Sequence, residues 1–216
     1  MEQMTQAQAI LPFKVALDGL CAKDSDFAGA RAKWGDPPDR FMAQNYASLA
    51  RIILGQQISR AVAITLWSRL EDKGWVDAPA LASLDYVDLQ HIGISGRKSE
   101  YLIDLARAVV TGALDIHALA DKSGEAVQEE LVSFRGIGAW TADNYRLFAL
   151  ADMDAWPGND LALQEGLKRL KGLEKRPSHA EMNKAADAWR PYRGAAALML
   201  WHIYAKLVRE ASPSSI

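Results

Sequence analysis

The apolar residues of this 216-residue chain recur with a helical period, and this pattern constrains the fold more than any other feature. In the segment NYASLARIIL, residues 45–54, Leu49, Ile52 and Ile53 fall on one face of a 3.6-residue repeat. No segment shows the convincing alternation of apolar and polar residues that indicates a half-buried β-strand. We therefore predict an all-α protein. The same repeat predicts further helices at residues 11–20, 60–70, 101–110, 125–134, 139–150, 161–170, 180–189 and 193–209.

Short turn-forming segments separate these helices and indicate where the chain divides. Gly55-Gln56-Gln57-Ile58 interrupts the helical pattern, and Ser59 is a residue type that favours the start of the next helix. Asp36-Pro37-Pro38-Asp39 forms a loop, and a second break lies near residues 153–158. We predict two helical subdomains, an internal one at residues 41–150 and a discontinuous outer one at residues 1–40 and 151–216.

Composition excludes several classes of protein. The single cysteine, Cys21, rules out a disulfide framework, a zinc site built on several cysteines and a cysteine-ligated iron–sulfur cluster. No two of the four histidines have metal-ligand spacing, so we expect neither a catalytic metal nor a cofactor. The apolar runs are too short for a membrane span and the N-terminus lacks a signal-peptide pattern. We expect a cytoplasmic monomer, associated with the nucleoid if the source is a bacterium.

The net charge of −2 argues mildly against DNA as a partner, but it does not exclude one. A protein can hold phosphates with backbone amides and a few local cations. The turn Phe134-Arg135-Gly136-Ile137-Gly138 offers such amides, because its two glycines permit positive φ and leave room for close approach. Backbone N–H groups at the start of the next helix, from Ala139, point outward and attract an anion. Two interpretations stay open for this turn. It is either a hairpin that binds a DNA phosphate and is held in place by a buried Ile137, or a tight corner between two helices.

Five segments together resemble the helix-hairpin-helix DNA glycosylase superfamily, in its DNA-3-methyladenine glycosylase II branch. The resemblance implies an all-α fold of two helical subdomains, with the helix-hairpin-helix at about residues 125–151 and the active site in the cleft between the subdomains. Order and spacing fit the family from roughly residue 36 to residue 204. The segments are LARIILGQQIS (49–59), IGISGRKSEYL (92–102), LVSFRGIGAWTA (131–142), WPGNDLAL (156–163) and WRPYRGAAALMLW (189–201).

The resemblance implies a monofunctional enzyme of base-excision repair. Such an enzyme flips an alkylated purine of the 3-methyladenine or 7-methylguanine type out of double-stranded DNA, hydrolyses its N-glycosidic bond and leaves an abasic site. In bifunctional relatives a lysine nucleophile follows the hairpin, whereas the matching position here is Trp140 and residues 135–167 contain no lysine. We therefore expect no lyase activity. The expected partner is duplex DNA with damaged bases, with no membrane and no obligate protein partner.

The family's catalytic aspartate corresponds to Asp160. An aspartate that only caps a helix is an equally ordinary reading, and the two roles are compatible. Bond cleavage builds positive charge on the deoxyribose, so a fixed carboxylate lowers the barrier and can orient or deprotonate the attacking water. For the neighbouring Asp143, Asp152 and Asp154 we expect solvated roles.

Substrate and DNA contacts also follow from the resemblance. Trp201 corresponds to the family's base-stacking tryptophan, and Trp140 and Asn144 correspond to residues that line the pocket. Cation–π attraction between an indole face and a cationic purine is worth about 0.5–2 kcal/mol. Gln57 aligns with the residue that fills the gap left by the flipped nucleotide, although a polar turn joining two helices would also explain Gln56 and Gln57. The DNA-binding set is Gln57, Gly136, Ile137, Gly138 and Ala139. Carbonyls of Val132, Phe134 and Ile137 could hold a monovalent cation.

Several alternatives stay open from the sequence. The same fold could act on deaminated bases, hypoxanthine or uracil, or the chain could bind DNA structure without catalysis, or serve only as a structural helical protein. Arg97 and Lys98 fit either phosphate contact or packing between subdomains. Arg193 fits either DNA contact or capping of the final helix, whereas core packing is the expected role of Trp189.

Overall fold

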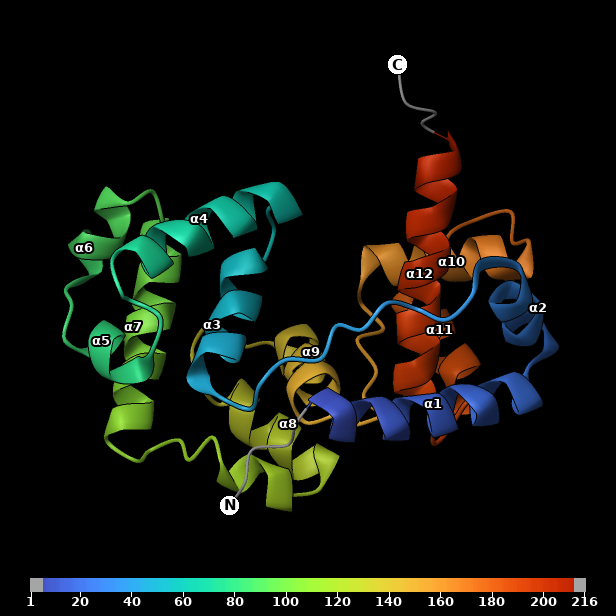
Figure 1. The fold of residues 1–216 in the computed structure, drawn as a ribbon, viewed down its shortest axis with the longest axis horizontal. Helices are drawn as coiled ribbons and strands as arrows, with labels where there is room; N and C mark the ends of the chain where they lie inside the picture. The colour runs from blue at the N-terminus through green and yellow to red at the C-terminus, as the bar shows by residue number, and fades with distance from the viewer. Residues whose placement is uncertain (1–5, 212–216) are drawn as a thin grey trace. The chain divides into compact units, whose positions relative to one another are not determined.

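The computed structural model describes residues 6–211, and within them it contains α-helices, one 3₁₀ helix and no β-strand (Figure 1). The all-α prediction is confirmed. No helix in this part of the chain combines the length and the apolar character needed to span a membrane. The helices are α1 (Gln6–Lys23), α2 (Ser25–Trp34), α3 (Tyr46–Gly55), α4 (Arg60–Asp72), α5 (Ala78–Ala82), α6 (Tyr86–His91), α7 (Gly96–Val110), η1 (Ala118–Asp121), α8 (Gly124–Val132), α9 (Ala139–Ala149), α10 (Leu161–Lys171), α11 (His179–Asp187) and α12 (Arg193–Ala211).

The described residues form two compact units. The first, residues 42–150, contains α3 to α9; the second, residues 6–41 and 151–211, contains α1, α2 and α10 to α12. In the first unit α3 packs against α4, α7 and α9. Leu49 and Ile53 of α3 are fully buried there with Tyr145 of α9. Tyr46 at the start of α3 donates its hydroxyl hydrogen to the carbonyl of Leu102 at 2.7 Å, which fixes α3 against α7.

The second unit is organised around α12. Helix α10 packs along α12, and α1 and α2 contact α12 as well. Asp24 links the parts of this unit: it caps α2, receives a hydrogen bond from the indole of Trp189 at 2.9 Å, and pairs with Lys171 at the end of α10 at 2.8 Å. Trp189 is only 3% exposed and packs edge-on against Phe27, as expected for a core residue.

The long helices lie where the sequence pattern places them, with ends shifted by a few residues. Ser59 accepts a hydrogen bond from the amide of Val62 and begins α4, as predicted. Helices α2, α5 and α6 and the 3₁₀ helix η1 were not predicted. Helices α5 and α6 have five and six residues, too few to show a 3.6-residue repeat. The aspartates that cap α2 and α5, Asp24 and Asp77, were the available sequence signal.

Candidate active site and nucleic-acid interface

Asp160 begins α10, and three N–H groups hold one oxygen of its carboxylate. Oδ1 accepts hydrogen bonds from the amides of Ala162 at 2.8 Å and Leu163 at 3.1 Å. The indole Nε1–H of Trp201 donates to the same oxygen at 3.1 Å. The interpretation of Asp160 as a helix cap is confirmed, and the carboxylate is fixed in one orientation beside a large aromatic ring.

Close packing of α10 on α12 brings Asp160 and Trp201 together. A Cβ added to Gly166 of α10 would lie 2.5 Å from the carbonyl oxygen of Leu200 on α12, so only glycine permits this approach. Trp201 follows Leu200 directly, and Asp160 lies at the end of α10 that faces it. Trp201 is 9% exposed, so its indole is largely enclosed. Its N–H bond to the carboxylate is a contact that the sequence interpretation, which gave Trp201 a base-stacking role, did not include.

The loop before Asp160 is held by ion pairs with the start of α12. Asp154 accepts hydrogen bonds from Arg193, at 2.9 Å from Nε and 2.8 Å from Nη2, and one from Arg190 at 2.9 Å. The amide of Gly194 donates to the carbonyl of Met153 at 2.7 Å. These contacts give Arg193 a structural role within its own unit. Asp154 is ion-paired, so the expectation that it is solvated is wrong.

Asp143 also departs from its expected solvated role. It is 6% exposed and forms an ion pair with Arg146, one helical turn along α9, at 2.9 Å. A buried carboxylate needs such a partner, because removing an unpaired charge from water is costly. The pair at positions i and i+3 of a predicted helix was the signal that could have revealed this contact.

The two glycines of the hairpin between α8 and α9 differ in backbone conformation and in the space around them. Gly136 has φ +90°, and an added Cβ would lie 2.3 Å from Cγ of Tyr101, so the fold itself demands glycine there. Gly138 has φ −97° and ψ 175°, which any residue adopts, and among the described residues, its two chain neighbours apart, no atom lies within 4 Å of an added Cβ. The sequence suggested that these glycines permit positive φ and leave room for close approach; Gly136 uses the first property and Gly138 has the second. Ile137, between them, is 5% exposed and pins the turn, as expected.

The loop after α3 carries two glutamines with different surroundings. Gln56 donates from Nε2 to the carbonyl of Gly136 at 2.9 Å and to the hydroxyl of Thr141 at 2.8 Å, so it joins this loop to the hairpin. Gln57 is exposed and has φ +56°, a left-handed conformation that costs a residue with a side chain about 1–2 kcal/mol. Such strain at an exposed tip is a common mark of a functional position.

Trp140 and Asn144 lie on consecutive turns of α9. Trp140 is partly exposed, whereas Asn144 is 3% exposed and donates from Nδ2 to the carbonyl of Trp140 at 2.6 Å. This bond fixes the amide of Asn144. Both residues belong to the first unit, whereas Asp160 and Trp201 belong to the second.

The cation site predicted from the carbonyls of Val132, Phe134 and Ile137 stays a prediction. The carbonyl of Phe134 accepts a hydrogen bond from the amide of Ile137 at 3.1 Å. A carbonyl oxygen has two lone pairs, so this bond leaves one with which Phe134 could bind a cation.

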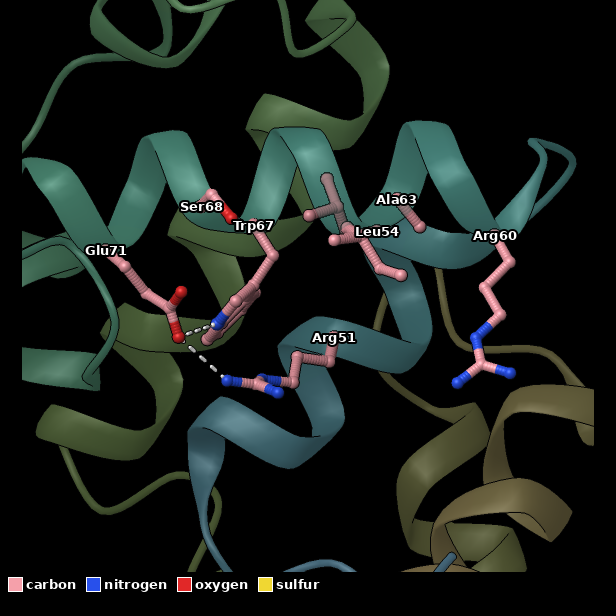
Figure 2. A pocket seen from close by; sticks show the side chains of 8 residues that line it. Arg51, Leu54, Arg60, Ala63, Trp67, Ser68 and Glu71 are labelled. Carbon is pink, nitrogen blue, oxygen red and sulfur yellow. Dashed lines mark hydrogen bonds and ion pairs between the residues drawn. The ribbon is translucent and has the colours of Figure 1, made fainter.

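A pocket of about 260 Å³ lies between α3 and α4 (Figure 2). At one end of it Arg51 and Trp67 both donate hydrogen bonds to the carboxylate of Glu71, and Arg60 lies at the other end. None of the predicted site residues lines this pocket.

Comparison with known proteins gives a consistent set of relatives. A family model described as HhH-GPD superfamily base excision DNA repair protein matches residues 50–191. A Bacillus subtilis (strain 168) protein, named provisionally as a DNA-3-methyladenine glycosylase, is 33% identical over 165 residues, which cover 72% of this chain and 58% of that protein. The chain thus spans little more than half the length of this relative.

Matches from Schizosaccharomyces pombe, one in sequence and one in structure, cover a larger share of the other chain. DNA-3-methyladenine glycosylase 1 is 29% identical over 171 residues, which cover 76% of this chain and 75% of the relative. The solved structure of a 3-methyladenine DNA glycosylase from this organism, in complex with abasic DNA, matches with a TM-score of 0.79 at 26% identity. That match covers 86% of this chain and 94% of the other.

Proposed function

Because the chain belongs to the HhH-GPD superfamily of base excision DNA repair proteins, we propose that it is a monofunctional DNA glycosylase for alkylated purines. It hydrolyses the N-glycosidic bond of bases of the 3-methyladenine or 7-methylguanine type in duplex DNA and leaves an abasic site. The relatives whose names specify 3-methyladenine support this substrate class. The observation that carries the proposal is the Asp160 carboxylate, held at a helix N-terminus by two amides and the indole of Trp201.

Asp160 provides the negative charge that the reaction needs. As the bond between the base and C1′ lengthens, positive charge develops on the deoxyribose, and a carboxylate already fixed in place stabilises that charge without reorganisation. The same carboxylate can orient the attacking water and accept its proton. The bond from Trp201 prevents Asp160 from rotating away from its capping position. An alkylated purine leaves as a neutral base, so the chemistry requires no general acid on the leaving group.

The aromatic residues select the base. A cationic alkylpurine is attracted to electron-rich indole faces, and Trp140 is the partly exposed candidate for that contact. Trp201 and Asn144 are more enclosed, at 9% and 3% exposure, and each holds a partner within its own unit: Trp201 holds the Asp160 carboxylate, and Asn144 holds the carbonyl of Trp140. Trp140 stands where bifunctional relatives have a lysine, which supports hydrolysis without a Schiff-base step.

The hairpin and the loop at Gln57 bind the DNA. The amides that follow Gly138 at the start of α9 can receive a phosphate, and the empty space around the Cα of Gly138 lets the phosphate approach the backbone. The exposed Gln57 side chain would fill the gap in the stack after the damaged nucleotide has been flipped. Neither contact needs a large positive charge, which agrees with the net charge of −2.

The experiment is a base-release assay on matched duplexes. One set contains 3-methyladenine or 7-methylguanine, a second contains hypoxanthine or uracil, and a third is undamaged. We expect free methylpurine from the first set only, abasic sites that break only after alkali, and no borohydride-trapped complex. Release from the second set alone would show that deaminated bases, and not alkylated purines, are the substrates. DNA binding without base release from any set would refute the proposal that the protein is an enzyme.

A further inference from the structure

The first turns of α7 contact both segments that the proposed function assigns to DNA. Lys98 donates from Nζ to the carbonyl of Leu54 and to the carbonyl of Gln56, each at 2.6 Å. These carbonyls belong to the last turn of α3 and its end, where a helix lacks internal donors and carries partial negative charge. The ammonium group of Lys98 therefore holds the loop from which Gln57 projects.

The same helix holds the hairpin. The ring of Tyr101 occupies the space beside Gly136 that a Cβ would need. Glu100 forms an ion pair with Arg135 at 2.7 Å, and the Arg135 guanidinium lies 5.6 Å from the centre of the Tyr101 ring. Thus one turn of α7 supports the Gln57 loop through Lys98 and the hairpin through Glu100 and Tyr101.

Gln56 is hydrogen-bonded both to Lys98 and to the hairpin. Its backbone carbonyl accepts from Lys98, and its side chain donates to Gly136 and Thr141 in the hairpin. Lys98, Gln56 and the hairpin are therefore connected by hydrogen bonds within one compact unit. Gln57, the next residue, makes none of these bonds and takes a left-handed conformation at the exposed tip.

From these contacts we propose that Lys98 is a positioning residue for nucleotide flipping. It holds Gln57 at a fixed distance from the phosphate-binding hairpin, so that both engage the same stretch of DNA. The inference rests on the proposed function and adds a residue that does not touch DNA in this account. Burial lowers the pKa of Lys98, which agrees with an ammonium that has exchanged water for two carbonyls.

A merely stabilising lysine and a positioning lysine differ in what they change. Loss of a positioning contact lets the loop leave the conformation in which Gln57 enters the stack, so flipping and base release fall while phosphate binding at the hairpin persists. Loss of the charged donor that holds the loop is expected to lower the population of the held conformation by about 10–100-fold.

The test compares Lys98→Met, Lys98→Arg and the control Lys73→Met, a lysine at the end of α4 in the same unit. Three quantities are measured on the full chain: the Kd for a duplex with an abasic analogue, the rate of flipping from 2-aminopurine fluorescence beside the lesion, and the single-turnover rate of base release. We expect Lys98→Met to slow flipping and release by about 10–100-fold while the Kd changes by less than about threefold. Lys98→Arg, which retains charged donors, restores most of the rate.

A double-mutant cycle with Gln57→Gly shows whether Lys98 acts through Gln57. If it does, Lys98→Met costs much of the flipping rate in the wild-type background and little in the Gln57→Gly background. Additive losses, or wild-type flipping in Lys98→Met, would overturn the inference. If Lys98→Met does not fold, Gln56→Met removes the next link in the same set and is expected to show the same pattern. A wild-type protein that flips the lesion but releases no base would contradict the proposed function alone.

Discussion

The two hairpin glycines allow the structural and DNA-binding demands of the turn to be separated by matched substitutions. Gly136→Ala places a side chain at φ +90°, which costs about 1–2 kcal/mol from the backbone alone. Its Cβ would also lie 2.3 Å from the Tyr101 ring, so that ring must move. We expect a total cost of roughly 2–5 kcal/mol, because overpacking adds about 1–3 kcal/mol. At about 2–4 °C for each kcal/mol, the Tm falls by roughly 4–20 °C.

Gly138→Ala should behave in the opposite way. Its backbone is extended, and in the part of the chain that the structure describes only its chain neighbours lie within 4 Å of the new methyl group, so the substitution costs the fold less than about 1 kcal/mol. A phosphate bound to the adjacent amides would meet that methyl group. Loss of one charge-assisted hydrogen bond weakens duplex binding by about 10–100-fold.

Thermal unfolding and fluorescence anisotropy on a labelled duplex at one fixed salt concentration measure both effects. The expected pattern is a low Tm for Gly136→Ala, and a near-normal Tm with a raised Kd for Gly138→Ala. If Gly138→Ala binds the duplex like the wild type, the hairpin amides do not hold a phosphate. Equal destabilisation by the two substitutions would refute the steric distinction between them.

Three further outcomes are expected. Trp201→Phe keeps an aromatic ring but removes the N–H bond to Asp160, so kcat should fall by about 10-fold or more with a smaller change in KM, as steady-state kinetics would report. Gln57→Gly should relieve the left-handed strain, leaving the Tm equal or higher while 2-aminopurine flipping slows; a lower Tm with normal flipping would contradict this. Burial raises the pKa of Asp24, but hydrogen bonds led by that from Lys171 outweigh it and hold the pKa below its usual 3.8. The ionised carboxylate therefore stabilises the fold above about pH 4, and this stabilisation is lost as the pH falls further. In urea unfolding, Asp24→Asn should have a lower free energy of unfolding than the wild type at pH 7, and the difference should shrink below pH 4.

The sequence predicted the elements whose apolar residues repeat over several turns. Helices α3, α7 and α10 show a clear apolar face, and their positions followed from it within a few residues. Helices α5 and α6 are too short to show a repeating apolar face, and both pack against α7. The N-cap role of Asp160 was also predictable, because a capping aspartate before an amphipathic segment is a local pattern.

Contacts between residues far apart in the sequence could not be predicted in this way. The bond from Trp201 to Asp160 depends on the close approach of α10 and α12 at Gly166, a glycine that gave no signal within its helix. The role of Lys98 depends on where α3 ends relative to α7. The different demands on Gly136 and Gly138 come from the position of Tyr101, 35 residues away from the first. Such tertiary contacts override what local propensity can specify.

If the charge of Asp160 drives base release, a substitution that removes the charge and keeps the helix cap should stop release. Asp160→Asn keeps an oxygen that can accept from Ala162, Leu163 and Trp201, so the cap and the fold are retained while the charge is lost. The control is Asp121→Asn, an exposed aspartate in the short 3₁₀ helix. Single-turnover release of 7-methylguanine from duplex DNA should fall by at least about 100-fold in Asp160→Asn, with the duplex Kd within about threefold of the wild type. Release at the wild-type rate by Asp160→Asn would show that the charge of Asp160 does not drive base release.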